Sequence, residues 1–226
     1  GEDEAAHVSK ILTKFMSRAF RRPVDKSETL PYLKFYQSIR PTLASLEEAM
    51  QETFAMILIS PDFLYLVEPS SETKRPLNDW EMASRLSYFL WSTMPDTQLF
   101  KLAREKKLRN PKVLQAEIER MISDERSWQF IEQFADQWLD LGAVQRVAVN
   151  PNYYPKFDDA LKTAMRQESL HFFEEIFQKD LSALNFIDSK FTMLNEPLAK
   201  HYGLTGPRGS SFERVDLNPK DHRGGV

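Results

Sequence analysis

The clearest helical signal in the chain is the run Asn78-Asp79-Trp80-Glu81-Met82-Ala83-Ser84-Arg85-Leu86-Ser87-Tyr88-Phe89-Leu90-Trp91. Asn78 is followed three residues later by Glu81, which is the spacing of a capping box that satisfies the free amides at a helix start. Apolar residues then occupy nearly every side of the predicted helix, a pattern typical of a buried helix. The run therefore predicts a central, buried helix over 78–91.

The distribution of glycine indicates that the rest of the chain is helical as well. No glycine lies between Gly1 and Gly142, and five of the seven glycines follow residue 202. Long glycine-free stretches suit helices and disfavour tight β-hairpins. We therefore predict an all-α fold, an irregular multi-helix bundle of eight or nine helices with little or no β structure. Residues 63–67 are expected to be extended, and 212–215 could form one strand.

Proline, glycine and polar clusters suggest three parts of the chain. Residues 1–68 are expected to form an N-terminal three-helix segment, and a polar connector follows to residue 75. Residues 76–203 are expected to form the main helical domain. Residues 204–226 are loop-like in composition, so we expect them to be weakly anchored and to begin a following module. Gly1 and the acidic residues after it resemble a cloning remnant or the start of an excised segment.

Composition narrows the possible partners. The 226 residues are 42% hydrophobic and 28% charged, with a net charge of −3. No excess of basic residues favours nucleic acid or an anionic membrane. The apolar runs are much shorter than the roughly 20 residues needed to span a bilayer. The chain has no cysteine, which excludes disulfides, thiolate catalysis and covalently attached haem c within it.

The carboxylate of Glu168 is expected to lie on an apolar helix face, where burying a charge is energetically costly. On the helix predicted over 157–178, Glu168 falls in the middle of an apolar face formed by Leu161, Met165 and Phe172. A carboxylate that faces a core must be paired or hydrogen bonded. Arg85 of the central helix is the favoured partner, because its planar guanidinium suits a buried pair. We therefore predict a structural ion pair between Glu168 and Arg85.

A metal site is the alternative interpretation of the same helix. Glu168, His171 and Glu175 follow one ridge, and a Glu-x-x-His pair is the ligand pattern of di-iron carboxylate bundles. Such bundles need a second Glu-x-x-His pair, which this sequence lacks. The metal candidates are therefore Glu168, His171 and Glu175, and the catalytic residues, if there are any, are unknown. No cofactor is expected in this fragment.

Five stretches resemble a known family: Arg75-Pro76-Leu77-Asn78-Asp79-Trp80-Glu81-Met82-Ala83-Ser84-Arg85-Leu86-Ser87-Tyr88-Phe89-Leu90-Trp91-Ser92-Thr93-Met94-Pro95-Asp96, Ala19-Phe20-Arg21-Arg22-Pro23, Phe134-Ala135-Asp136-Gln137-Trp138-Leu139, Asn195-Glu196-Pro197-Leu198-Ala199-Lys200-His201-Tyr202-Gly203 and Arg223-Gly224-Gly225. The family comprises large secreted multidomain proteins that are abundant in planctomycetes. The main domain resembles domain-of-unknown-function family 1592, preceded by the end of a 1595-type module and followed by the start of a 1588-type module.

The resemblance implies context more than activity. It implies an extracytoplasmic protein, periplasmic or secreted, in which haem c is carried by modules elsewhere in the parent chain. The expected partners are the neighbouring domains of that chain. No catalytic residues are established for these modules. Three functions stay open: a structural or interaction module without an activity of its own, an enzyme domain with a carboxylate-histidine metal site, and a carbohydrate-binding module suggested by the aromatic content of 12%.

Overall fold

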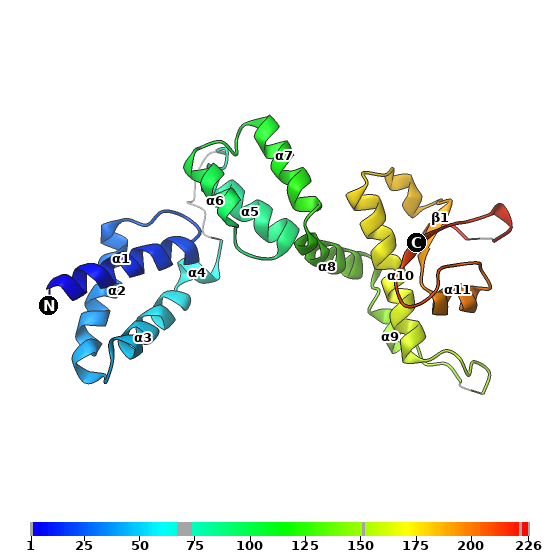
Figure 1. Cartoon of the computed structure of the whole chain (residues 1–226), viewed down its shortest axis with the longest axis horizontal. Helices are drawn as coiled ribbons and strands as arrows, with labels where there is room; N and C mark the ends of the chain where they lie inside the picture. Colours follow the sequence, from blue (N-terminus) through cyan, green and yellow to red (C-terminus); the bar gives the residue numbers. More distant parts are fainter. Residues whose placement is uncertain (1, 67–73, 151, 222, 226) are drawn as a thin grey trace. The chain divides into compact units, whose positions relative to one another are not determined.

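A computed structural model describes residues 2–66, 74–150, 152–221 and 223–225. Within these ranges the chain forms eleven α-helices and one two-stranded sheet, so the predicted all-α fold is confirmed. The number of helices exceeds eight or nine, and two of them, α4 and α9, are single turns (Figure 1). The α-helices are α1 Glu2–Ala19, α2 Lys26–Ile39, α3 Leu46–Leu58, α4 Pro61–Leu64, α5 Asp79–Trp91, α6 Thr97–Arg104, α7 Pro111–Ile122, α8 Trp128–Leu139, α9 Ala143–Arg146, α10 Asp159–Gln178 and α11 Glu196–Tyr202.

Short 3-10 turns and two strands complete the described secondary structure. The strands are β1, Phe191–Leu194, and β2, Glu213–Asp216. The 3-10 turns are η1 Arg40–Thr42, η2 Glu125–Ser127, η3 Ala183–Phe186 and η4 Pro219–Asp221. No helix in the described ranges is both long enough and apolar enough to cross a membrane.

The chain divides into two compact units. Unit 1 comprises residues 1–88 and 93–115, and unit 2 comprises 89–92 and 116–226. We expected an internal boundary in the connector at 68–75, most of which lies outside the described residues. The division into domains at 1–68, 76–203 and 204–226 stays a prediction.

The first three helices of unit 1 enclose an apolar core. Val8, Leu12 and Met16 recur at helical spacing on α1 and are fully buried. They pack with Tyr36 of α2 and with the buried face of α3. A capping box starts α2, because the Asp25 carboxylate accepts the Glu28 amide and Glu28 in turn accepts the Asp25 amide.

Two local predictions for the helices α4 and α5 need correction. Residues 63 and 64 were expected to be extended but lie in α4, which Pro61 opens at its first position; Val67 lies outside the described residues. The capping box at Asn78 and Glu81 is present as predicted. The helix it starts is not buried on all sides, however, because 64% of Phe89 is exposed.

In unit 2, the long helix α10 is the central element. It packs against α8, α9, α11 and β1, and Figure 1 shows β1 and α11 beside it. Ile131 and Ala135 of α8 meet Leu170 and Phe173 of α10 in one buried cluster. Helix α11 begins at the N-cap Asn195 and ends at Gly203, which has a left-handed conformation.

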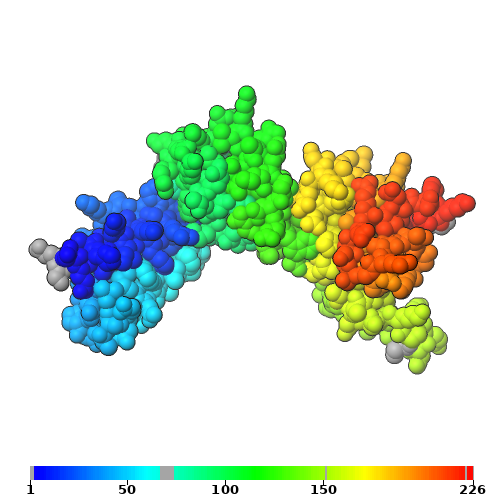
Figure 2. All heavy atoms as spheres, viewed as in Figure 1, coloured from blue at the N-terminus to red at the C-terminus, as the bar shows by residue number. Residues whose placement is uncertain are grey.

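The C-terminal segment is anchored to unit 2, so the expectation of weak anchoring was wrong. Strand β2 pairs antiparallel with β1, with Phe191 opposite Asp216 and Leu194 opposite Glu213. Phe212 and Val215 of this segment pack on the cluster that includes Leu161 and Leu198. In Figure 2 the red atoms of the segment lie against the orange atoms of α11. Strand β1 was not predicted, because its four residues are all buried and therefore lack the alternation of apolar and polar residues that marks a half-buried strand.

Candidate functional site

Glu168 is the buried carboxylate that the sequence indicated. Helix α10 begins at the N-cap Asp158, whose carboxylate accepts the Leu161 amide at 2.8 Å. From there, helical periodicity carries Glu168 to the same side as Leu161 and Phe172. All three are buried, and only 9% of Glu168 is exposed. The prediction that this carboxylate faces the core is therefore correct.

Three groups hold the Glu168 carboxylate, each from a different segment. The Thr192 hydroxyl of β1 donates to Oε1 at 2.7 Å, and the Tyr202 hydroxyl at the end of α11 donates to Oε2 at 2.8 Å. Arg223 of the C-terminal segment places Nη2 3.5 Å from Oε1. The carboxylate thus ties α10 to β1, to α11 and to the C-terminal segment. We call Glu168, Thr192, Tyr202 and Arg223 the Glu168 cluster.

Arg223 is held in place by its surroundings. Its guanidinium carbon lies 3.6 Å from the centre of the Tyr202 ring, a cation–π arrangement. The next two residues fit closely against the chain before β1. A Cβ atom on Gly224 would lie 3.0 Å from the Ser189 carbonyl oxygen, and one on Gly225 would lie 2.6 Å from the Phe186 carbonyl oxygen. Gly225 also has a φ of 74°, which favours glycine.

The electrostatics of the cluster keep Tyr202 protonated. Burial raises the pKa of the Tyr202 hydroxyl above its ordinary value of 10.0, and the adjacent Glu168 carboxylate raises it further. At neutral pH the phenol is therefore a hydrogen-bond donor. A general acid or base needs a pKa near the working pH, which this phenol does not have.

The cluster also borders a cavity of about 410 Å³. Met165, Phe172 and Leu141 supply part of its apolar wall, and Arg166 and Asp140 lie at its edge. Arg166 is engaged with α8, since its Nε donates to Asp136 at 2.7 Å and its Nη2 to Glu132 at 3.1 Å. The charged groups around this cavity thus link helices to one another.

The predicted partner of Glu168, Arg85, belongs to unit 1, whereas Glu168 belongs to unit 2. The pair therefore stays a prediction. The burial of Glu168 does not depend on it, because Thr192, Tyr202 and Arg223 already supply hydrogen-bond donors to the carboxylate. These partners could not be recognised from local sequence, since they come from distant segments. Only the resemblance singled out the stretches that contain Tyr202 and Arg223.

His171 has aromatic partners and one carboxylate partner. Its ring lies between Trp128, with ring centres 5.0 Å apart, and Phe212, at 4.8 Å. Its Nδ1 lies 2.9 Å from a carboxylate oxygen of Glu174, one turn further along α10. His171 therefore joins α10 to the start of α8 and to the segment before β2.

Glu175 is buried in a separate ion-pair cluster. Its Oε1 accepts from Lys179 at 2.7 Å and from Arg214 of β2 at 3.2 Å. Burial raises the pKa of the Glu175 carboxyl, but the hydrogen bonds and charges of Lys179 and Arg214 outweigh burial and leave it below the ordinary value. The carboxylate is thus ionised and fastens β2 to α10.

The three metal candidates therefore lie on one helix with different partners. Across the described ranges, no group of three or more His, Cys, Asp or Glu side chains is arranged to hold a metal ion. Glu168, His171 and Glu175 as a metal site stay a prediction, and the structure supplies another role for each of them.

A second buried charge serves unit 1 in a similar way. Arg21, which follows α1 with a φ of 59°, is only 5% exposed. Its guanidinium donates to the carbonyl oxygens of Asp62, Phe63 and Tyr65 at 2.8, 3.0 and 2.7 Å. Sequence reasoning did not single out this role, because the acceptors are backbone atoms of α4 and its end.

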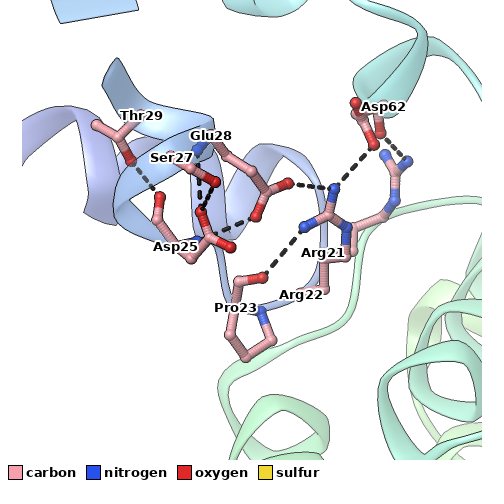
Figure 3. Close-up of polar contacts among 8 residues, drawn as sticks. All are labelled: Arg21, Arg22, Pro23, Asp25, Ser27, Glu28, Thr29 and Asp62. Atoms are coloured by element: carbon pink, nitrogen blue, oxygen red, sulfur yellow. Dashed lines mark hydrogen bonds and ion pairs between the residues drawn. The ribbon is translucent and has the colours of Figure 1, made fainter. Parts of the chain in front are cut away.

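The neighbouring arginine completes this link. Arg22 pairs with Glu28 at 2.7 Å and with Asp62 at 2.9 Å. Figure 3 shows both arginines directed toward Asp62, with Glu28 reaching Arg22 from the start of α2. The pair Arg21 and Arg22 therefore connects the end of α1 to α2 and α4.

Two family models match most of the chain. Residues 77–204, more than half of the chain, match the family described as PSD4, a protein of unknown function (DUF1592). Residues 7–68 match the family described as PSD5, a protein of unknown function (DUF1595). The two families and their order are those that the sequence resemblance indicated. No curated protein and no solved structure matches the chain.

Proposed function

The chain belongs to the PSD4 family of proteins of unknown function (DUF1592), and we propose that it is a structural and interaction module of a longer protein. The PSD5 match at 7–68 precedes the PSD4 match at 77–204, so two family domains follow one another in one chain. In this proposal the module has no activity of its own and positions the neighbouring domains of its parent protein.

The proposal rests on two buried charged side chains, Glu168 and Arg21, because each of them joins separate segments of the chain. Glu168 joins α10 to β1, α11 and the C-terminal segment. Arg21 joins the end of α1 to three carbonyl groups around α4. An active site needs polar groups that are free to meet a substrate. Here the buried charges of Glu168 and Arg21 stabilise the arrangement of chain segments instead.

We also propose a cellular location for the parent protein. The sequence resemblance supports an extracytoplasmic parent protein, periplasmic or secreted, that is linked to redox chemistry. Haem c attachment requires cysteines, and this chain has none. The haem-bearing modules would therefore be neighbours of this chain, and holding them at fixed positions is the task we propose for it.

The test compares this chain alone with a longer form of the parent protein that includes the flanking modules. Rotational correlation times from nuclear magnetic resonance relaxation would be measured for both. A positioning module predicts that the flanking modules tumble together with this chain as one body. Independent tumbling of the flanking modules would contradict the proposal.

A metal-dependent enzyme is the competing function. It predicts about one equivalent of bound transition metal in the purified chain, and loss of that metal in Glu168→Gln and His171→Ala. Elemental analysis of the three proteins separates the two functions. Metal bound at stoichiometric amounts through these residues would replace the structural proposal.

A further inference from the structure

Unit 1 contains a cleft that the structural role of the chain does not explain. Its volume is about 780 Å³, within the range of about 300 to 1,000 Å³ that is usual for ligand sites. The walls come from the C-terminal half of α1, from the start of α5 and from α6 with the residues before it. None of the Glu168 cluster lines it.

The cleft is strongly basic. Lys14 and Arg18 lie one turn apart on α1, and Lys101 and Arg104 lie one turn apart on α6. All four are exposed, and none forms a hydrogen bond or ion pair through its side chain with another described residue, although Lys101 and Arg104 help to lower the pKa of the nearby Glu105 carboxyl. The chain as a whole has a net charge of −3, so this concentration of positive charge is local. Such a cleft attracts anionic ligands.

Arg22 also lines the cleft, but its guanidinium is engaged with Glu28 and Asp62. The available positive charges are therefore the two pairs, one on each wall. Two separated pairs suit a ligand that carries acidic groups at intervals along its length. A single small anion would meet only one wall.

Two aromatic rings line the same cleft. Trp80 and Phe100 lie with ring centres 6.0 Å apart and ring planes at 44°, and both are partly exposed. Sugar rings present flat C–H faces that pack on such surfaces, and indole is the largest aromatic surface that a protein offers. The ligand would thus combine ring faces with repeated acidic groups.

Polar groups at the rim point to the same ligand class. Ser17 and Thr97 contribute hydroxyl groups to the lining. The Asp96 carboxylate also lines the cleft and accepts the Leu99 amide at 2.9 Å, which caps α6. The carboxylate and the two hydroxyl groups can hydrogen bond to sugar hydroxyls.

We propose that this cleft binds an acidic oligosaccharide, with its carboxylate or sulfate groups on Lys14, Arg18, Lys101 and Arg104 and a sugar ring on Trp80. A nucleic acid also has rings and repeated charge, but it carries fewer hydroxyl groups that Ser17, Thr97 and Asp96 could bind. An acidic peptide would use the basic pairs without needing Trp80. Both are alternatives that the test separates.

The test is calorimetric titration of the full chain with defined hexamers at about 0.1 M salt. The probes are a uronate hexasaccharide, a sulfated hexasaccharide, an uncharged hexasaccharide, hexaglutamate and a single-stranded DNA hexamer. The proposal predicts that at least one acidic hexasaccharide binds at least about 10-fold more tightly than the three other probes. The preferred member of the acidic pair identifies whether carboxylate or sulfate is recognised. Equal or tighter binding of hexaglutamate or DNA would overturn the proposal, as would no binding of either acidic hexasaccharide.

Variants locate the site. Lys14→Gln with Arg18→Gln removes one basic pair, and the affinity should fall about 10-fold, as expected for two exposed charge contacts. The matched control is Lys34→Gln with Lys112→Gln, which removes two exposed positive charges of unit 1 outside the cleft. The control should bind within about twofold of the unchanged protein. Equal losses of affinity in both double variants would show that the ligand is attracted by net charge alone. That result would overturn the assignment of the binding site to this cleft.

The aromatic contact needs its own readout. Trp80→Leu should weaken binding about 5-fold or more, and Trp80→Phe should restore part of the loss because a ring is kept. Thermal unfolding of each variant checks that it is folded. If Trp80→Leu does not fold, Lys101→Gln with Arg104→Gln on the surface of α6 provides the second test, with the same expected loss of about 10-fold. Unchanged affinity in that variant would overturn the proposal.

Discussion

The hydroxyl of Tyr202 donates a 2.8 Å hydrogen bond to Oε2 of Glu168 and thereby joins the end of α11 to the middle of α10. Thr192 and Arg223 reach the other carboxylate oxygen from β1 and from the C-terminal segment. Burial removes water from the carboxylate, and these three donors replace the hydrogen bonds that are lost. The Glu168 cluster therefore links segments that are far apart in sequence.

Tyr202→Phe tests the hydrogen bond without removing the ring. The phenylalanine keeps the apolar contacts and a surface for Arg223, but leaves Oε2 of Glu168 without this donor. We expect a loss of about 1 to 3 kcal/mol in the free energy of unfolding at pH 7, as for a hydrogen bond to a charged group. Urea denaturation measures it. Tyr153→Phe, at an exposed tyrosine, should change the free energy by less than about 0.5 kcal/mol.

The raised pKa of Tyr202 predicts a loss of stability in alkali. A group whose folded pKa lies above its unfolded value stabilises the fold fully below the unfolded pKa, and this contribution disappears as the pH rises. For Tyr202 the ordinary value is 10.0, so the contribution should decline above pH 10. The free energy of unfolding of the unchanged protein should therefore fall more steeply above pH 10 than that of Tyr202→Phe. Tyr36, whose pKa is also raised, is present in both proteins. If the free energies of unfolding of the two proteins fall in parallel above pH 10, the raised pKa of Tyr202 would be contradicted.

Gly225→Ala tests whether the C-terminal segment is fixed against unit 2. An added Cβ would lie 2.6 Å from the Phe186 carbonyl oxygen, and the φ of 74° is unfavourable for alanine. Faster amide hydrogen exchange in β2 and a free-energy loss of about 1 to 3 kcal/mol are expected. The control is Gly142→Ala, where the nearest atoms are 3.8 Å away and φ is −59°, and it should be nearly neutral. Equal exchange rates in the two variants would show that the contact at Gly225 is unimportant.

Arg21→Lys tests the corresponding link in unit 1. Lysine keeps the charge but cannot form the planar fork that reaches the carbonyl oxygens of Asp62, Phe63 and Tyr65. Amide exchange in α4 should become faster, with a loss of about 2 to 3 kcal/mol in the stability of that region. Arg18→Lys, at an exposed arginine on α1, is the matched control and should leave exchange unchanged. Protection of α4 that survives Arg21→Lys would refute this role.

Local signals explain what could be predicted from the sequence. The capping boxes at Asp25 and Asn78, the N-cap at Asn195 and the glycine stop at Gly203 are all present, because each depends on residues within one or two turns. Helix α4 was missed, although Ser60-Pro61 is itself a helix-start signal. The short apolar run that follows is also typical of an extended segment, so the local pattern is ambiguous.

Contacts between distant segments explain what could not be predicted. Strand β1 is only four residues long and forms because β2 pairs with it. The burial of Glu168 followed from helical periodicity, whereas its donors Thr192, Tyr202 and Arg223 are set by tertiary structure. Periodicity identifies the inward side of a helix and not the residues that it meets.

The most direct test of the structural role of Glu168 is urea unfolding of Glu168→Gln, with metal chelated and again with added zinc or iron. Glutamine keeps the size but lacks the charge that Tyr202, Thr192 and Arg223 stabilise. We predict a loss of about 2 to 4 kcal/mol that is the same in both conditions, and a smaller effect of Tyr202→Phe when Glu168→Gln is already present. The exposed Glu213→Gln should cost less than about 0.5 kcal/mol. A Glu168→Gln cost below about 0.5 kcal/mol, or metal that stabilises only the unchanged protein, would contradict the structural role.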